Sequence, residues 1–118
     1  MKKPGDIKGQ EIRALEILLR LRNVIRDRAA AGAQPSYTAK LLAGAPQLPA
    51  RKLAEEAVEL ALAAVGGVKS EIAAEAADLL YHLLVLLQSA DVPLEDVCAI
   101  LESREGISGI TEKAGRKK

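Results

Sequence analysis

Residues 52–87 read KLAEEAVELALAAVGGVKSEIAAEAADLLYHLLVLL, and this stretch decides the fold. It predicts two helices, because alanine- and leucine-rich runs flank the pair Gly66-Gly67, which ends a helix readily. Both predicted helices carry acids where a bundle helix carries apolar residues. Asp78 opens the leucine run, so we expect it in the core, where a carboxylate needs a positive partner. The pattern indicates acids held around a divalent cation.

The composition favours one small helical domain. The chain has 118 residues, of which 49% are hydrophobic and only 2% aromatic, and leucine and alanine dominate the apolar content. Strands draw on β-branched and aromatic residues, so this content favours helix. A net charge of +1 argues against a nucleic-acid-binding protein, and any phosphate recognition must be local.

The sequence gives no indication of a membrane or an oxidising compartment. Residues 1–11 lack the apolar region of a secretory signal, and residues 79–87 are too few to span a bilayer. Cys98 is the single cysteine, so no disulfide framework is expected, and we predict that it is buried in a helix. We therefore expect a cytoplasmic protein without membrane contact.

Helical spacing and capping residues predict five helices, at residues 10–31, 37–43, 49–65, 70–90 and 93–106. Ser36 and Ser70 are expected to cap the second and fourth of them, and Gly32 to end the first. Residues 33–35 are expected to form a turn and residues 44–49 a loop. No stretch alternates at period two, so the prediction is an all-α bundle.

Residues 10–106 are expected to form the domain, with residues 1–9 as a flexible lead-in and residues 107–118 as a polar basic tail. The fourth predicted helix is apolar around most of its circumference between residues 72 and 87. Such a helix is buried on several sides, and a chain of this length offers few helices to cover it. We therefore expect a homodimer that completes the bundle.

The acids form two stripes that can face each other. Glu56 and Glu59 lie one turn apart on the third predicted helix, and Glu55 neighbours Glu59. Glu75 and Asp78 share a stripe with His82 on the next helix. If the two helices pair antiparallel, these carboxylates converge, and their repulsion favours a hard cation such as Mg²⁺.

A simpler interpretation stays open for part of this set. Glu55, Glu56 and Glu59 also fit a solvated helix face, with Lys52 as their salt-bridge partner. His82 is better explained as a hydrogen-bonded residue that supports the metal ligands than as a metal ligand itself. Asp78 separates the two interpretations, because a non-catalytic dimerisation module has no reason to keep it beside the leucines.

Three motifs resemble a known enzyme family. Glu55-Glu56-Ala57-Val58-Glu59 followed by Glu75-Ala76-Ala77-Asp78 resembles the EExxE and ExxD motifs of MazG-type all-α nucleotide pyrophosphohydrolases. The segments SYTAKLL (residues 36–42) and ADLLYHLLVLL (residues 77–87) resemble the phosphoribosyl-ATP pyrophosphatases more closely, as does the tail segment 104–114. The resemblance covers most of residues 10–115.

The resemblance implies Mg²⁺-dependent hydrolysis of phosphoribosyl-ATP to phosphoribosyl-AMP and pyrophosphate, the second step of histidine biosynthesis, by a homodimer. Its motifs imply a catalytic set of acids in which all but the first are metal ligands: Glu55, Glu56, Glu59, Glu75 and Asp78. They also imply substrate-binding residues near the start of the second and third predicted helices: Ser36, Tyr37, Thr38, Lys40 and Lys52. A MazG-like enzyme acting on a dNTP such as dUTP is the alternative within enzymes.

Two positions depart from the family's usual pattern. Ala54 stands where the family usually has a glycine before the paired glutamates, which narrows the space there slightly. Leu48-Pro49 replace a segment that often carries a basic residue and an isoleucine. A phosphate contact from this loop is therefore not expected.

Overall fold

The computed structural model describes residues 5–31 and 36–106, and within them it is all helical. The five helices are α1 (Gly9–Ala31), α2 (Tyr37–Ala43), α3 (Gln47–Gly66), α4 (Lys69–Ser89) and α5 (Leu94–Ser103). The predicted all-α class is confirmed. The predicted turn at 33–35 and its Gly32, the tail at 107–118 and the first four residues lie outside the described part.

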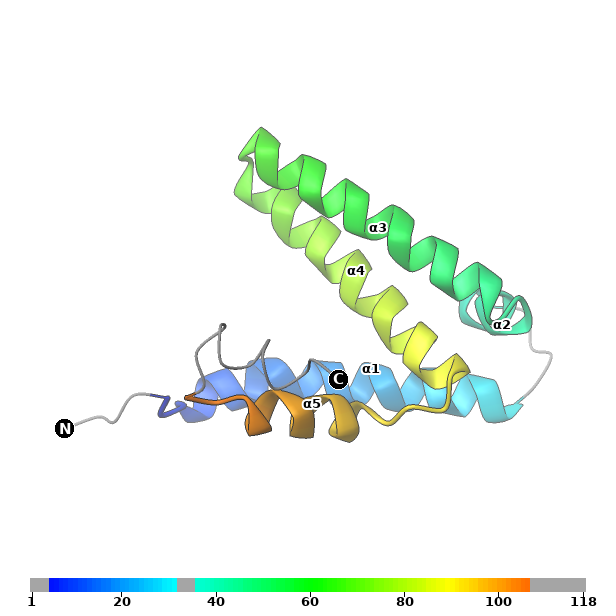
Figure 1. Ribbon diagram of the computed structural model, residues 1–118, viewed down its shortest axis with the longest axis horizontal. Helices are drawn as coiled ribbons and strands as arrows, with labels where there is room; N and C mark the ends of the chain where they lie inside the picture. Colours follow the sequence, from blue (N-terminus) through cyan, green and yellow to red (C-terminus); the bar gives the residue numbers. More distant parts are fainter. Residues whose placement is uncertain (1–4, 32–35, 107–118) are drawn as a thin grey trace, which may run out of the picture.

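The α3–α4 hairpin is the centre of the molecule. Its two long helices run side by side and antiparallel, and they share more contacts than any other pair of helices (Figure 1). Helix α1 crosses the lower end of α4, and α2 packs between α1 and the base of the hairpin (Figure 1). The tip of the hairpin therefore projects beyond the helices that support its base.

Helix α2 is fixed at both ends as predicted. The Ser36 hydroxyl accepts a hydrogen bond from the Ala39 N–H at 2.9 Å, which satisfies one of the free donors of the first turn. Gly44 ends the helix and donates to the carbonyls of Leu41 and Leu42. A Cβ on Gly44 would lie 2.7 Å from the Cβ of Leu48, so this close turn needs glycine.

The other helix boundaries lie within three residues of the predicted ones, but the predicted cap at Ser70 is wrong. Helix α3 begins at Gln47, so Pro49 lies within its first turn, where its missing N–H costs no helical hydrogen bond. Helix α4 begins at Lys69, and Val68, not Ser70, takes the N-cap position without a side-chain cap. Gly67 ends α3 with φ +79°, so a two-residue turn suffices and α4 starts at once. Helix α5 ends at Ser103 rather than at residue 106.

The core is small and lies at the base of the hairpin. Its buried members, from α1, α2 and α4, are Ile25, Leu41, Leu84 and Val85. Leu48 packs against them from the first turn of α3. Large apolar side chains elsewhere stay exposed, on the first half of α1 and on the face of α3 opposite α4. No helix of the described residues is long and apolar enough to cross a membrane.

Two burial predictions are wrong. Cys98 is exposed, because α5 has little more than its first turn against the rest of the described chain. Asp78 is also exposed, although leucines follow it directly. Helix α1 crosses only the lower end of α4, so the upper part of α4 packs mainly against α3 (Figure 1).

Candidate metal centre

The hairpin brings acids from both of its helices together. Glu56 comes from α3, and Glu75 and Asp78, one turn apart, come from α4. Each offers a carboxylate oxygen, and these oxygens all lie within 4.8 Å of one another. The expected convergence of the two acid stripes is therefore present for these three side chains, which we call the acid triad.

Two oxygens of the acid triad are buried without a partner. Within the described residues, the Oε2 atoms of Glu56 and Glu75 are shielded from solvent and make no hydrogen bond. The salt bridges found among the described residues involve Glu16, Glu55 and Glu95, so none of them reaches these atoms. A buried charged oxygen without a donor is destabilising, so these atoms need a ligand or a proton.

The carboxyl groups of Glu56 and Glu75 are correspondingly hard to ionise. Burial is the main cause that raises the pKa of Glu56 above its ordinary value of 4.5, and the neighbouring Glu59 carboxyl group adds to it. Burial likewise comes first in raising the pKa of Glu75, followed by the charges of Glu59 and Asp78. Glu59 thus lies close to the acid triad, although it is exposed and outside the 4.8 Å set. The site carries excess negative charge that a cation would relieve.

The acid triad fits a hard divalent cation. Mg²⁺ takes oxygen ligands at about 2.1 Å, so two oxygens on one ion lie at most about 4.2 Å apart. The 4.8 Å limit within the triad is close to that spacing. The Oε2 atoms of Glu56 and Glu75 make no hydrogen bond within the described residues, so both are available as metal ligands. Carboxylates without nitrogen or sulfur donors favour Mg²⁺ over zinc or copper.

Glu55 lies outside the acid triad and pairs with basic residues of its own helix. The Glu55 carboxylate pairs with Arg51 at 3.6 Å and with Lys52 at 3.5 Å on the exposed side of α3. This is the solvated arrangement considered for the whole first acid cluster, and it holds for Glu55 but not for Glu56. The two adjacent glutamates are about 100° apart on the helix, which explains the different surroundings.

The residues of α2 are divided between inward and outward contacts. Thr38 is buried and its hydroxyl bonds to that of Tyr81, while Tyr37 is 50% exposed and bonds to His82. Lys40 is exposed, and the Ser36 hydroxyl is used as the cap. Sequence reasoning missed Tyr81. Its place directly before His82, in a chain with only two tyrosines, was the available signal.

The two departures from the family pattern leave the acid triad unchanged. Leu48 is half-buried against the core and Pro49 is fully buried, so both side chains serve packing. Ala54 is exposed and lies about 200° around α3 from Glu56. Its methyl group therefore points away from the acids in the single chain.

Glu75→Gln is expected to stabilise the metal-free protein at neutral and alkaline pH. A raised native pKa stabilises the fold below the ordinary value of 4.5, and this contribution is lost as pH rises through the native pKa. Glutamine has no charge to lose, so the melting temperature of the variant should exceed that of the parent by a few degrees at pH 8. The difference should shrink towards pH 4.5. Thermal melts in EDTA measure this difference. Equal melting temperatures at pH 8 would contradict a destabilising effect of ionised Glu75.

Comparison with known proteins places the chain in a family. The phosphoribosyl-ATP pyrophosphohydrolase model matches residues 18–105. A phosphoribosyl-ATP pyrophosphatase of Methylobacterium nodulans is 54% identical over 98 residues, which are 83% of this chain and 92% of the relative. One from Cereibacter sphaeroides is 52% identical over 86% of this chain and 99% of the relative, and one from Agrobacterium fabrum is 51% identical over 81% and 90%. The chain belongs to the phosphoribosyl-ATP pyrophosphohydrolase family, a family of helical MazG-like fold.

Proposed function

We propose that this protein hydrolyses phosphoribosyl-ATP to phosphoribosyl-AMP and pyrophosphate in a Mg²⁺-dependent reaction. This is the second step of histidine biosynthesis, and the proposal places it in the cytoplasm. The observation that carries it is the acid triad with its two unpaired buried oxygens, in a chain related to enzymes named for this activity. Water hydrolyses the phosphoanhydride bond between the α and β phosphorus atoms, and phosphoribosyl-AMP and the pyrophosphate anion are released.

The acid triad supplies the binding part of this proposal. Glu56, Glu75 and Asp78 would hold the ion from two helices, which fixes its place relative to the hairpin. When bound, Mg²⁺ neutralises phosphate charge and lowers the pKa of a coordinated water. Glu59, close to Glu56 and Glu75 and open to solvent, is the carboxylate best placed to bind further water or to complete the ligand set.

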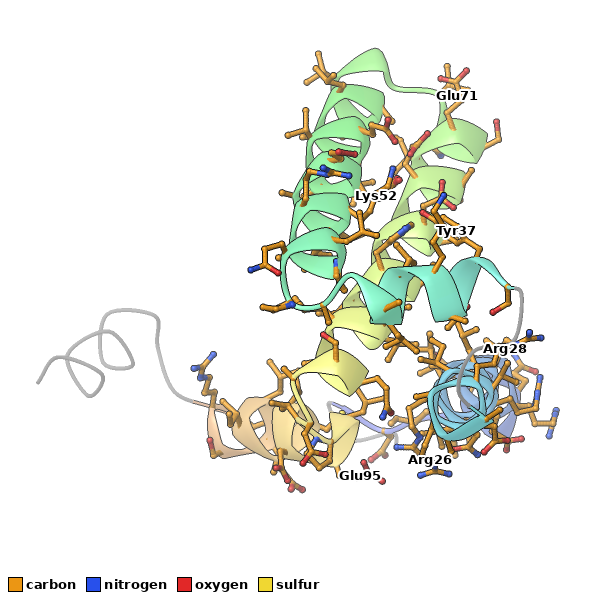
Figure 2. The ribbon with its side chains drawn as sticks, turned by 90° about the vertical axis from the view of Figure 1, so that its right-hand side faces the viewer. Arg26, Arg28, Tyr37, Lys52, Glu71 and Glu95 are labelled. Carbon is orange, nitrogen blue, oxygen red and sulfur yellow. The ribbon has the colours of Figure 1, made fainter. Side chains whose placement is uncertain are left out.

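Positive charge for the substrate phosphates is available from Lys52, which lies one turn before Glu56 on α3. Lys52 on α3 and Tyr37 on α2 project from one face of the hairpin (Figure 2). Lys52 is about one third exposed and is paired only loosely, at 3.5 Å, with Glu55. We assign Lys52 and Lys40 to the phosphates, because a substrate with four or more negative charges would compete well for exposed ammonium groups. Ser36 contributes by holding the start of α2.

We further propose that the active unit is a homodimer. Val58, Leu62 and Val65 form one apolar face of α3, and Leu62 is 67% exposed. Ile12 and Leu15 on α1 form a second exposed apolar stripe. Arginines border the α1 stripe and glutamates border the hairpin, so two copies related by a twofold axis match both apolarity and charge.

The test is pyrophosphate release from phosphoribosyl-ATP with Mg²⁺ and after its removal by EDTA. We expect turnover that returns when Mg²⁺ is restored, and a preference over dUTP as the comparison substrate. Titration of Mg²⁺ without substrate should raise the melting temperature at millimolar metal, because an ion that binds only the folded state stabilises it. Release that is indifferent to Mg²⁺, or a preference for dUTP, would contradict the proposal.

A further inference from the structure

The two tyrosines and the single histidine of the chain meet at one place, the contact of α2 with α4. Tyr37 and Tyr81 stack with ring centroids 6.2 Å apart, and His82 lies edge-on to both rings. Two hydroxyl contacts cross this junction. Thr38 bonds to Tyr81, and the Tyr37 hydroxyl lies 3.2 Å from Nε2 of His82. Consecutive residues of one helix thus bond to consecutive residues of the other.

The hydrogen bonds of His82 have a direction. Its Nδ1 lies 2.8 Å from the main-chain carbonyl oxygen of Asp78, one turn earlier on α4. A carbonyl only accepts, so Nδ1 carries the proton and donates. In the neutral ring Nε2 is then the acceptor, and the Tyr37 O–H donates to it. The hydrogen bonds therefore run from the Tyr37 hydroxyl through the His82 ring to the main chain of Asp78.

This path ends at a member of the acid triad. The carbonyl that His82 holds belongs to Asp78, whose carboxylate oxygen converges with those of Glu56 and Glu75. His82 is only 6% exposed, so its ring is held by packing, whereas Asp78 is exposed. A fixed ring that bonds to an exposed turn can restrict the directions in which the Asp78 side chain points. Figure 2 shows Tyr37 on the α2 side of this junction.

We propose that Tyr37 is a positioning residue for the metal centre, acting through His82 on Asp78. This inference rests on the proposed function, because it needs the acid triad to bind the ion. The Tyr37 hydroxyl hydrogen is used by His82 and is not free for the substrate. Tyr37 thereby couples the position of α2 to that of the acid triad. Helix α2 also carries Lys40, which we assign to the substrate phosphates. Loss of the hydroxyl loosens Asp78 but leaves the ring and its stacking in place.

Tyr37→Phe is the direct test, with Mn²⁺ affinity measured by electron paramagnetic resonance in the absence of nucleotide. We expect dissociation constants about three- to tenfold above the parent, below the roughly 10- to 100-fold that loss of a direct outer hydrogen-bond partner costs, because Tyr37 acts through His82. In steady-state assays kcat should fall at limiting Mg²⁺, while KM for the nucleotide at saturating Mg²⁺ stays within twofold. Tyr81→Phe is the matched control: it removes the neighbouring hydroxyl bridge, and its Mn²⁺ affinity should equal that of the parent.

Variants of His82 separate a path through the ring from a direct effect. His82→Asn keeps an amide N–H near the position of Nδ1 but does not reach Tyr37, so Tyr37→Phe should have no further effect in this background. His82→Gln reaches Tyr37 but loses the donor to Asp78, and should bind Mn²⁺ as weakly as Tyr37→Phe or more weakly. A double variant in which the two effects simply add would overturn the path through His82.

The single histidine gives a readout that needs neither metal nor nucleotide. In protein labelled with ¹⁵N-histidine, the only ring should show a protonated Nδ1 and an unprotonated Nε2. Tyr37→Phe should shift the Nε2 resonance, and Tyr81→Phe should shift it much less. A ring protonated only on Nε2 would overturn the inference.

Failure of this inference is distinguishable from failure of the proposed function. A parent that binds Mn²⁺ but releases no pyrophosphate would refute the activity, and the metal affinities would still decide about Tyr37. Unchanged Mn²⁺ affinity in Tyr37→Phe together with a raised KM would make Tyr37 a direct substrate contact and overturn the positioning role. A parent that binds no divalent cation would overturn both.

Discussion

Asp78→Asn is expected to lower the rate of pyrophosphate release by about a hundredfold or more. Asparagine keeps the size and one oxygen of aspartate but removes the charge that the proposed Mg²⁺ site draws from α4. An ion in such a site contributes several kcal/mol of transition-state stabilisation, and each 1.4 kcal/mol lost costs a factor of about ten. Activity at saturating Mg²⁺ and the Mg²⁺ concentration for half-maximal rate are both measured, and the second should rise.

Glu71→Gln is the matched control for this variant. Glu71 is an exposed acid on the same helix and lies at the tip of the hairpin, outside the acid triad (Figure 2). Its loss removes one negative charge from α4, as Asp78→Asn does, so a general effect of charge on substrate binding would appear in both variants. We expect at most a twofold change in rate. Equal activity of Asp78→Asn and the parent would remove Asp78 from the metal centre.

The local signals in this sequence predicted local structure well. Ser36 caps the start of α2 and Gly44 ends it, as predicted, because each satisfies backbone groups within its own turn. The predicted cap of α4 at Ser70 was wrong, because a cap position also depends on the length of the turn before it. Gly67 reverses the chain in its left-handed conformation, which leaves Ser70 already inside the helix. A serine is a cap only if the preceding turn ends next to it, and the preceding turn here was shorter than expected.

The candidate site was predictable in its composition but not in its division of roles. Spacing placed Glu56, Glu75 and Asp78 on facing stripes, and the structure brings their oxygens together. Spacing alone did not separate Glu56 from Glu55, because that depends on which side of α3 meets α4. The hydroxyl bridges of Tyr37 and Thr38 were also out of reach, since they depend on how α2 packs across α4. Contacts between helices distant in sequence carry no local pattern.

Burial was predicted least well. The proposed dimer offers a reason, because a second copy would cover apolar faces that one chain leaves exposed. Cys98 was expected inside because a lone cysteine is usually buried, and Asp78 because it adjoins leucines on its helix. The single chain buries only four large apolar residues of its described part, and leaves Leu62 and Leu15 at least 60% exposed. An apolar pattern predicts what will be covered, but not by which copy of the chain. The outer face of α3 is therefore where the proposed dimer is most directly tested.

Leu62→Glu is expected to convert a dimer into monomers. Leu62 lies at the centre of the apolar face of α3, with Val58 and Val65 one turn away on either side. In an isolated chain an exposed substitution changes stability by at most about 0.5 kcal/mol. In a symmetric dimer the glutamate is buried twice, at roughly 1.5 kcal/mol or more each, so the dissociation constant should rise by about a hundredfold or more. Light scattering should then give a mass near 12.5 kDa, against twice that for the parent.

Leu62→Met separates loss of apolarity from loss of shape, because methionine is apolar and similar in volume. It should remain dimeric. If pyrophosphate release needs the second copy, Leu62→Glu should lose activity at low protein concentration and regain part of it as concentration rises, while Leu62→Met follows the parent. A parent of 12.5 kDa at micromolar concentration would exclude the dimer. A dimeric Leu62→Glu would move the interface to the other exposed stripe, on α1, where Leu15→Glu makes the same test.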